Sequence, residues 1–218
     1  MSAGTLVPLE SARSIAIRRA YYRFSQSWLS LFGLALVVLL LVIALFGAAL
    51  APYPEHIAGG LNTAAKFRPP SLAHPFGTNE LGQDVLSLVL GGARVSLLAG
   101  FAVVALGAAA GILIGAVAGY AGGWTDDILM RLADLKLTIP GLILAMAVAA
   151  ALGPGMTNMV IAIALSWWPG FARLVRAEVM ACKEEVYVTA ARAMGAGPGR
   201  ILFRHILPNV MTPVIVKM

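Results

Sequence analysis

The feature that most constrains this chain is a series of long apolar blocks bounded by polar or basic residues. Residues 28–51 contain no charged side chain, and further blocks cover residues 94–120, 127–152 and 158–173. A helix needs roughly 20 apolar residues to cross a bilayer, so blocks near this length predict membrane-spanning helices. Only 12% of the residues are charged, about half the share found in soluble domains. We therefore expect an all-α, polytopic transmembrane helix bundle.

The blocks divide the chain into an N-terminal segment (1–27), a first span (28–51), a loop (52–93) and a core domain (94–218). Prolines in the loop exclude one continuous helix, and we expect a short helix there that begins near Asn79. The core domain holds three further spans (94–120, 127–152 and 158–173), a polar segment (174–208) and the start of a fifth span (209–218). About ten residues are too few to cross a membrane, so we expect the chain to be truncated within that fifth span.

Basic residues are concentrated in two of the polar segments, and cytoplasmic segments of membrane proteins carry such an excess. This distribution predicts a cytoplasmic N-terminus, an extracytoplasmic loop and a cytoplasmic segment at 174–208. A cleaved signal peptide is the alternative for the first block, because Ala49-Leu50-Ala51 is similar to a cleavage site. The block is longer than the 7 to 15 residues that are typical of signal cores. The basic residues concerned are Arg13, Arg18, Arg19 and Arg23 in the first segment, and Arg176, Lys183, Arg192, Arg200 and Arg204 in the second.

Four glycines recur every four residues in the second span, at Gly107, Gly111, Gly115 and Gly119. This spacing places them on one helical face, where a neighbouring helix can approach closely. We expect the stripe to be a helix-packing surface.

Charged residues at two places in the spans need an explanation, since ionised groups are costly in lipid unless they are paired or near the headgroups. Arg131, Asp134 and Lys136 lie in the first turns of the third span. Arg131 and Asp134 are spaced to pair on one face, and we expect them to mark the cytoplasmic edge, with a pathway role as the alternative. Lys217 is expected to face the bundle interior or to belong to an altered end.

The segment 174–208 is expected to contain two short helices. Residues 184–194 are compatible with an amphipathic surface helix that has Val186, Ala190 and Ala193 or Met194 on one face. The glycine-rich run 195–199 then breaks this helix, and a second helix is expected over residues 200–207, ending before Pro208.

Several function classes are disfavoured by the sequence. One cysteine excludes an internal disulfide framework, and the three histidines have no metal-site spacing. No stretch of basic residues interleaved with aromatics suggests nucleic-acid binding. Hydrolase, zinc-peptidase and phosphate-binding motifs are missing from the sequence, so the chain has no P-loop for ATP. A secondary carrier or channel remains the main alternative, although such proteins usually place ionisable residues near mid-bilayer.

Three motifs carry a specific resemblance. Thr189-Ala190-Ala191, then Gly195, then Leu207-Pro208 resembles the EAA motif of ABC importer permeases, with Thr189 in the place of its glutamate. The stretches 74–87 (HPFGTNELGQDVLS) and 118–126 (AGYAGGWTD) resemble the dipeptide, oligopeptide and nickel permeases. The likeness covers residues 23–218.

The resemblance implies a type I ABC importer fold with a cytoplasmic coupling helix that seats on an ATPase subunit. It implies a permease subunit for peptides in the inner membrane, with nickel or another small solute as the alternative cargo. Its partners would be a second permease, two ATP-binding subunits that hold ATP and Mg, and an extracytoplasmic substrate-binding protein, so the chain itself needs no cofactor and is not an enzyme. The motif glutamate helps to anchor the ATPase in the family, and Glu184 or Glu185 is expected to substitute for it here. The expected coupling residues are Glu184, Glu185, Tyr187, Thr189, Ala190, Ala191, Arg192, Gly195 and Pro208.

Overall fold

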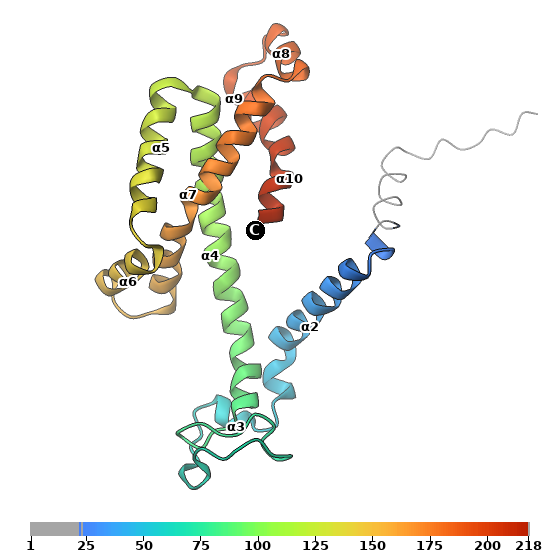
Figure 1. The fold of residues 1–218 in the computed structure, drawn as a ribbon, viewed down its shortest axis with the longest axis vertical. Coiled ribbons are helices and arrows are strands. Elements are labelled where there is room, and N and C mark those ends of the chain that lie inside the picture. Colours follow the sequence, from blue (N-terminus) through green and yellow to red (C-terminus); the bar gives the residue numbers. More distant parts are fainter. Residues whose placement is uncertain (1–21, 23, 218) are drawn as a thin grey trace, which may run out of the picture. The chain divides into compact units, whose positions relative to one another are not determined.

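The computed structural model describes residue 22 and residues 24–217, and the regular elements of this part of the chain are helices (Figure 1), joined by loops with one isolated β-bridge between Thr78 and Asp84. The expected cytoplasmic arginines at 13, 18, 19 and 23 lie outside the described residues. The expectation of an all-α protein is confirmed. Its elements are α2 (Trp28–Leu50), α3 (Pro54–Ile57), the 3-10 helix η1 (Thr63–Ala65), α4 (Val85–Ala121), α5 (Gly123–Thr138), α6 (Gly141–Leu152), α7 (Met156–Lys183), α8 (Val186–Ala193), α9 (Pro198–Arg200), the π-helix η2 (Ile201–Ile206) and α10 (Leu207–Lys217).

Three described helices, α2, α4 and α7, are long and apolar enough to cross a membrane, and α5 with α6 forms a bent fourth candidate. The chain divides into two compact units, one up to Ser96 and one from Leu97 onward. In the first unit, α2 buries none of its most apolar window within the protein. A helix that is apolar on all sides and unburied by protein is suited to lipid.

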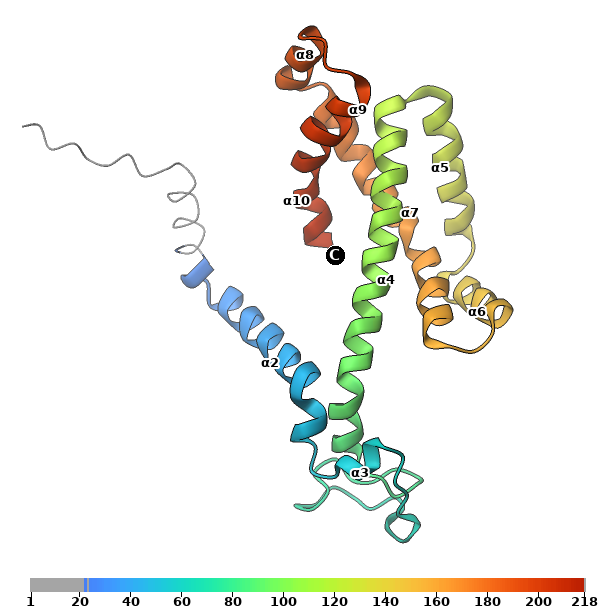
Figure 2. The same cartoon turned by 180° about the vertical axis from the view of Figure 1, so that it is seen from behind.

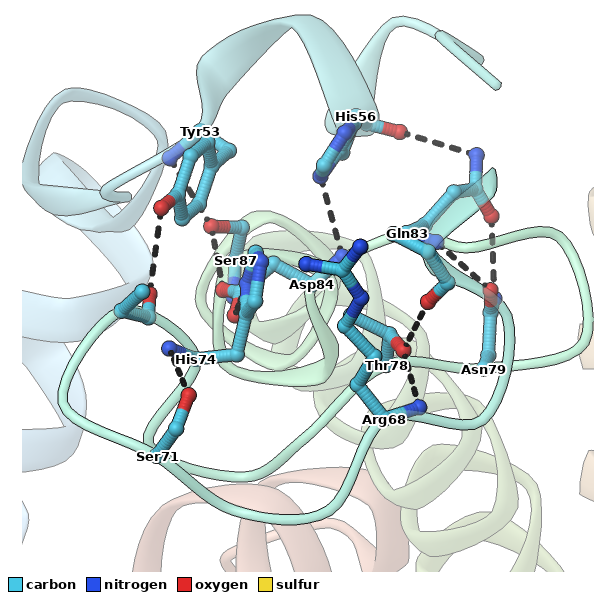
Figure 3. A network of polar contacts seen from close by, with 12 residues as sticks. Tyr53, His56, Arg68, Ser71, His74, Thr78, Asn79, Gln83, Asp84 and Ser87 are labelled. Atoms are coloured by element: carbon cyan, nitrogen blue, oxygen red, sulfur yellow. Dashed lines mark hydrogen bonds and ion pairs between the residues drawn. The ribbon is translucent and has the colours of Figure 1, made fainter. Parts of the chain in front are cut away.

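The loop between α2 and α4 is cross-linked by buried polar side chains (Figure 3). Asp84 is fully buried, and its Oδ2 accepts hydrogen bonds from both the N–H and the hydroxyl of Ser87 at 2.8 Å. Its Oδ1 lies 3.0 Å from His74 Nδ1, and its N–H donates to His56 Nδ1 at 2.9 Å. The ring of Tyr53 packs against both imidazoles. The loop thus has a polar core centred on one carboxylate.

Asp84 also begins α4, because a side chain that accepts from the N–H three residues onward is a helix N-cap. Burial by itself raises the pKa of a carboxyl, but the hydrogen bonds from Ser87 and His74 outweigh it and hold the pKa of Asp84 below its ordinary value of 3.8.

The prediction of a short helix that begins near Asn79 is wrong. Asn79 Oδ1 accepts from the N–H groups of Leu81 and Gln83, which holds a turn instead. The helix starts at Val85 and continues through the expected second span.

The third span expected over residues 127–152 is not one straight helix. It is broken between α5 and α6, which are bent by 91°. Pro140 has no N–H for a continuing helix and disfavours helical geometry at the residue before it. Ile139 is accordingly extended, with φ −89° and ψ 122°.

In the second unit, α7 is the central helix and packs against α5, α6 and α10 (Figures 1 and 2). One continuous core joins α4, α7, α8, η2 and α10. Its buried residues are Ala108, Ala116, Phe171, Val175, Val179, Val188, Ile201, Leu202, Ile206, Val210 and Val214.

The glycine stripe of α4 faces α7. A Cβ on Gly111 would lie 2.6 Å from the carbonyl oxygen of Trp168, and one on Gly115 would overlap the carbonyl of Ala172. Gly119 and Gly107 likewise approach α7, at Arg176 and Trp167. The two backbones are therefore too close for a side chain at Gly111, Gly115 and Gly119, whereas the approach at Gly107 is looser, with Trp167 Cβ 3.2 Å from the added Cβ.

Replacement of Gly115 by alanine should destabilise the packing of α4 on α7. The added Cβ meets backbone atoms of Ala172, which cannot rotate away, and overpacking costs about 1 to 3 kcal/mol. Thermal unfolding of the purified protein in detergent measures the effect. Gly100→Ala in the same helix is the matched control, because no atom lies within 4 Å of its Cβ position. Equal stability of the two variants would contradict this packing.

Replacement of Asp84 by alanine should loosen the loop, because it removes the N-cap of α4 and leaves the buried Ser87 hydroxyl without its acceptor. We expect a loss of about 1 to 2 kcal/mol, measured as faster hydrogen exchange of the loop peptides. Ser71→Ala, which removes an exposed hydrogen bond to the N–H of His74, should have little effect.

The same contacts set a pH dependence. The pKa of Asp84 in the folded protein lies below its ordinary value of 3.8. The stability that its carboxylate gives to the loop is therefore fully present above pH 3.8 and is lost as the pH falls through the folded pKa. If acid did not reduce the hydrogen-exchange protection of the loop in the wild-type protein, this role of Asp84 would be contradicted.

Candidate functional site

The connection between α7 and α10 projects helix α8 from one end of the second unit (Figures 1 and 2). Val188 is fully buried and Ala191 is nearly so. Val188 belongs to the same core cluster as Val179 of α7 and Ile206 of η2. A short helix that shares a core with two longer elements is held rigidly between them, since close-packed interiors transmit displacement.

The residues expected to form the apolar face of α8 point away from the core of the second unit. Val186 and Met194 are each 82% exposed, and Ala190 and Ala193 are exposed as well. The core is contacted instead by Val188 and Ala191, which lie on the other side of the helix. Because α8 has apolar residues on both sides, it leaves an uncovered apolar surface, defined here as Val186, Ala190, Ala193 and Met194. Exposed apolar patches bounded by polar residues often mark interaction sites. The polar neighbours Thr189 and Arg192 are exposed beside it.

Gly195 ends α8 in a Schellman motif. Its N–H donates to the carbonyl of Arg192, and the N–H of Ala196 donates to the carbonyl of Ala191, both at 3.0 Å. The φ of Gly195 is +82°, which is strained for residues with a side chain. The glycine therefore fixes the direction in which the chain leaves the helix.

Tyr187 ties α8 to the elements on either side of it. Its hydroxyl contacts Cys182 Sγ of α7, accepts from Asn209 Nδ2 of α10 at 3.0 Å, and lies 3.4 Å from the carbonyl oxygen of His205. The hydrogen bond with Cys182 and then burial raise the pKa of Tyr187 above its ordinary value of 10.0. The hydroxyl therefore stays neutral and can act as donor and acceptor.

Glu184 and Glu185 occupy the short link between α7 and α8. Glu184 follows the last residue of α7, and Glu185 precedes α8, where its backbone carbonyl accepts the N–H of Val188. Both side chains are exposed. Glu185, Glu178, Tyr187 and Asn209 are among the residues that line an open cleft of about 490 Å³. The carboxylates of Glu178 and Glu185 in this cleft can accept hydrogen bonds from a basic side chain.

The helix expected to end before Pro208 continues past it. The π-helix η2 precedes Pro208, and the N–H of Leu207 donates to the carbonyl of Leu202, five residues back. Pro208 has no N–H to contribute, and the side chain of Asn209 donates to the carbonyl of His205 at 2.7 Å. The wider turn and this side chain allow α10 to follow without a break. Single π-turns are frequent at functional sites.

Two long-range ion pairs join α7, the helix that leads into α8, to α5. The sequence did not predict either of them. Arg176 makes a two-pronged contact with Asp126 of α5, with Nη2 to Oδ2 at 2.6 Å. Arg173 Nη2 lies 2.5 Å from Asp134 Oδ1, so the pairing of Asp134 expected with Arg131 is wrong. Partners 39 and 50 residues apart leave no local spacing signal.

The last turn of α7 is joined to α4 in the same region. Lys183 Nζ donates to the carbonyl of Tyr120 at 3.1 Å, close to the end of α4. A cation near exposed carbonyls at a helix C-terminus is favourable. Within residues 22 and 24–217, no group of three or more His, Cys, Asp or Glu side chains is arranged to hold a metal.

Two family models match the sequence. Residues 111–218 match the model described as binding-protein-dependent transport system inner membrane component. Residues 16–70 match the model described as the N-terminal TM domain of oligopeptide transport permease C.

Curated relatives match over most of the chain. It is similar to the dipeptide transport system permease protein DppC of Alkalihalophilus pseudofirmus, at 38% identity over 92% of this chain and 65% of the relative. It is 34% identical to the oligopeptide transport system permease protein OppC of Bacillus subtilis, over 95% of this chain and 68% of the relative. It is 41% identical to the glutathione transport system permease protein GsiD of Escherichia coli, over 89% and 63%. The chain thus spans about two thirds of the length of these relatives.

Replacement of Gly195 by alanine should destabilise the α8 connection by about 1 kcal/mol, because alanine disfavours the positive φ found there. Thermal unfolding in detergent measures the change. Gly199→Ala is the control, since that glycine has no positive φ and no atom within 4 Å of its Cβ position. If the two substitutions were equivalent, the Schellman ending of α8 would be unsupported.

Proposed function

We propose that this chain, which belongs to the binding-protein-dependent transport system inner membrane component family, is a permease subunit of an ATP-driven ABC importer of peptides. The observation that carries the proposal is α8, whose apolar surface is uncovered while Val188 is locked into the core of α7 and η2. A helix of this kind can receive a partner on one side and transmit its movement to the spans on the other.

The partner proposed for this surface is an ATP-binding subunit. In a complete importer, two such subunits bind ATP and Mg, and this chain and a second permease form the pathway. A substrate-binding protein delivers the cargo from outside. Movement of the ATPases would displace α8, and packed helices that shift between discrete arrangements would give alternating access. Besides this apolar surface, the residues proposed to couple the chain to the ATPase are Glu184, Glu185, Tyr187, Thr189, Ala190, Ala191, Arg192, Gly195 and Pro208, with the buried Ala191 acting through packing.

The proposed orientation follows the distribution of basic residues. The segment from Arg173 to Pro208 contains six Lys or Arg residues and three Glu residues, and an excess of basic residues favours the cytoplasm. The N-terminus is proposed to lie on the same side, and the loop built around Asp84 on the opposite one. This arrangement places α8 where cytoplasmic ATPases can reach it.

Peptides are proposed as the cargo because the names of three similar permeases specify a dipeptide, an oligopeptide and glutathione. Nickel or another small solute is the alternative cargo. An ATPase-independent secondary carrier is the alternative mechanism, and dependence of uptake on the ATP-binding subunits distinguishes the two mechanisms.

Acidic substitutions on the apolar surface of α8 should uncouple the ATPase. Compared with the wild type, the double variant Val186→Asp, Met194→Asp is expected to bind about one tenth as much ATP-binding subunit or less. The reason is that burying an unpaired carboxylate at an interface is costly. Co-purification of the full-length permease with its ATP-binding subunits measures retention. Both side chains are 82% exposed, so the substitutions remove little core packing.

The double variant Gly197→Asp, Gly199→Asp is the matched control. It adds the same two negative charges in the same segment at exposed positions outside α8, and it should retain the ATPase. Full retention by the variant with both substitutions in α8 would refute the proposed contact. If the wild type retained no ATPase and imported peptides without one, the secondary carrier would replace the importer.

A further inference from the structure

Two lysines from different helices donate to backbone carbonyls of α7 that are about one helical turn apart. Lys136 Nζ of α5 donates to the carbonyl of Ser166, and Lys217 Nζ of α10 donates to the carbonyl of Gly170 at 2.5 Å. Carbonyls four residues apart lie on one face of a helix, about 6 Å apart along its axis. Lys217 Nζ also lies 5.3 Å from the centre of the Phe171 ring. The two acceptor carbonyls therefore lie on one face of α7, one before and one after Pro169.

Lys136 lies in the second half of α5, well away from the start of that helix. It follows Asp126, which pairs with Arg176 at the start of α5, by about ten residues, or about 15 Å of helix. The hydrocarbon core is roughly 30 Å thick, so a span that enters it at Asp126 would place Lys136 near half of its depth. The break at Pro140 comes less than two turns later. Transporters often bind their cargo near the midplane, where helices are discontinuous.

Neither lysine has a carboxylate partner in the described part of the chain. Its Asp and Glu ion pairs are made by His74, Arg173 and Arg176. A carbonyl oxygen satisfies only one of the three N–H donors of an ammonium group and leaves its charge uncompensated. Because an isolated charge in a membrane is costly, such residues usually face a water-filled cavity or mark a substrate pathway.

We propose that Lys136 and Lys217 form an anion subsite of the transport pathway that binds the carboxylate of the passing peptide. The ammonium groups would exchange their carbonyl acceptors on α7 for the charged oxygens of the cargo. A carbonyl is a weaker partner than a carboxylate, because hydrogen bonds between two ionised groups are the stronger ones. The carboxylate therefore displaces the carbonyls while the peptide is bound, and the ammonium groups return to the carbonyls of Ser166 and Gly170 when it leaves. This inference rests on the proposed function as a peptide permease.

The test compares peptides that differ only in their carboxylate. Proteoliposomes containing the complete transporter, with its ATP-binding subunits and binding protein, are supplied with a library of two- to five-residue peptides. Each peptide is present as the free acid and as the C-terminal amide, and the acid-to-amide import ratio is measured by mass spectrometry. Because the binding protein is the same in every assay, its own preference cancels when variants are compared with the wild type.

We expect Lys136→Gln to lower the acid-to-amide ratio about tenfold, which corresponds to the loss of one hydrogen bond to a charged group. Lys136→Arg, which keeps the positive charge, should largely restore the ratio. Lys183→Gln is the matched control, because it removes another bond from a lysine to a backbone carbonyl, at the end of α7, and should leave the ratio unchanged.

The outcomes separate the two proposals. A ratio that is the same in wild type and Lys136→Gln overturns the subsite and leaves the peptide importer intact. This includes the result in which the carboxylate that compensates Lys136 belongs to a partner subunit, since both forms of the peptide would then be affected equally. If the wild type imports no peptide from the library, the proposed function fails and the subsite fails with it.

Discussion

The close backbone approach of α4 to α7 is the contact on which the second unit depends. Gly111 and Gly115 bring the two helices together at Trp168 and Ala172. Helices in lipid gain little from hydrophobic burial, so van der Waals contact over bare backbone is the main source of their association. With α4 fixed on one side of α7, the other sides remain available for α5, α6 and α10. The core that reaches Val188 in α8 is built on this arrangement.

Polar contacts then fix the ends of the helices that the glycine stripe brings together. The pair of Arg176 with Asp126 and the bond from Lys183 to Tyr120 hold α5 and α4 to α7 near α8. Tyr187 joins α8 to α10 through Asn209. Movement imposed on α8 therefore acts on several helices at once, as the proposed coupling requires. Lys136 and Lys217 are instead proposed to exchange their carbonyl acceptors on α7 for the carboxylate of the cargo.

The α8 segment illustrates how far sequence reasoning reaches. Its helix and its glycine ending were predictable, because Gly195 follows an apolar periodic run and glycine favours the left-handed geometry of a helix end. Which face would be buried was not predictable, since both sides carry apolar residues and only contact with Val179 and Ile206 selects Val188. Pro208 was misleading for a related reason. A proline normally stops a helix, but the preceding π-turn and the side chain of Asn209 accommodate it.

The sequence by itself determined the membrane class, the approximate positions of the long apolar helices, the glycine face of α4 and the segment that contains α8. These features depend on hydrophobicity and on spacings of three or four residues, which are local properties of the chain. Only the tertiary structure decided that Asp84 would organise the loop with His56 and His74, and that Lys136 would reach the same face of α7 as Lys217. Such contacts join residues far apart in the chain, and their partners are chosen by how helices pack and where they bend.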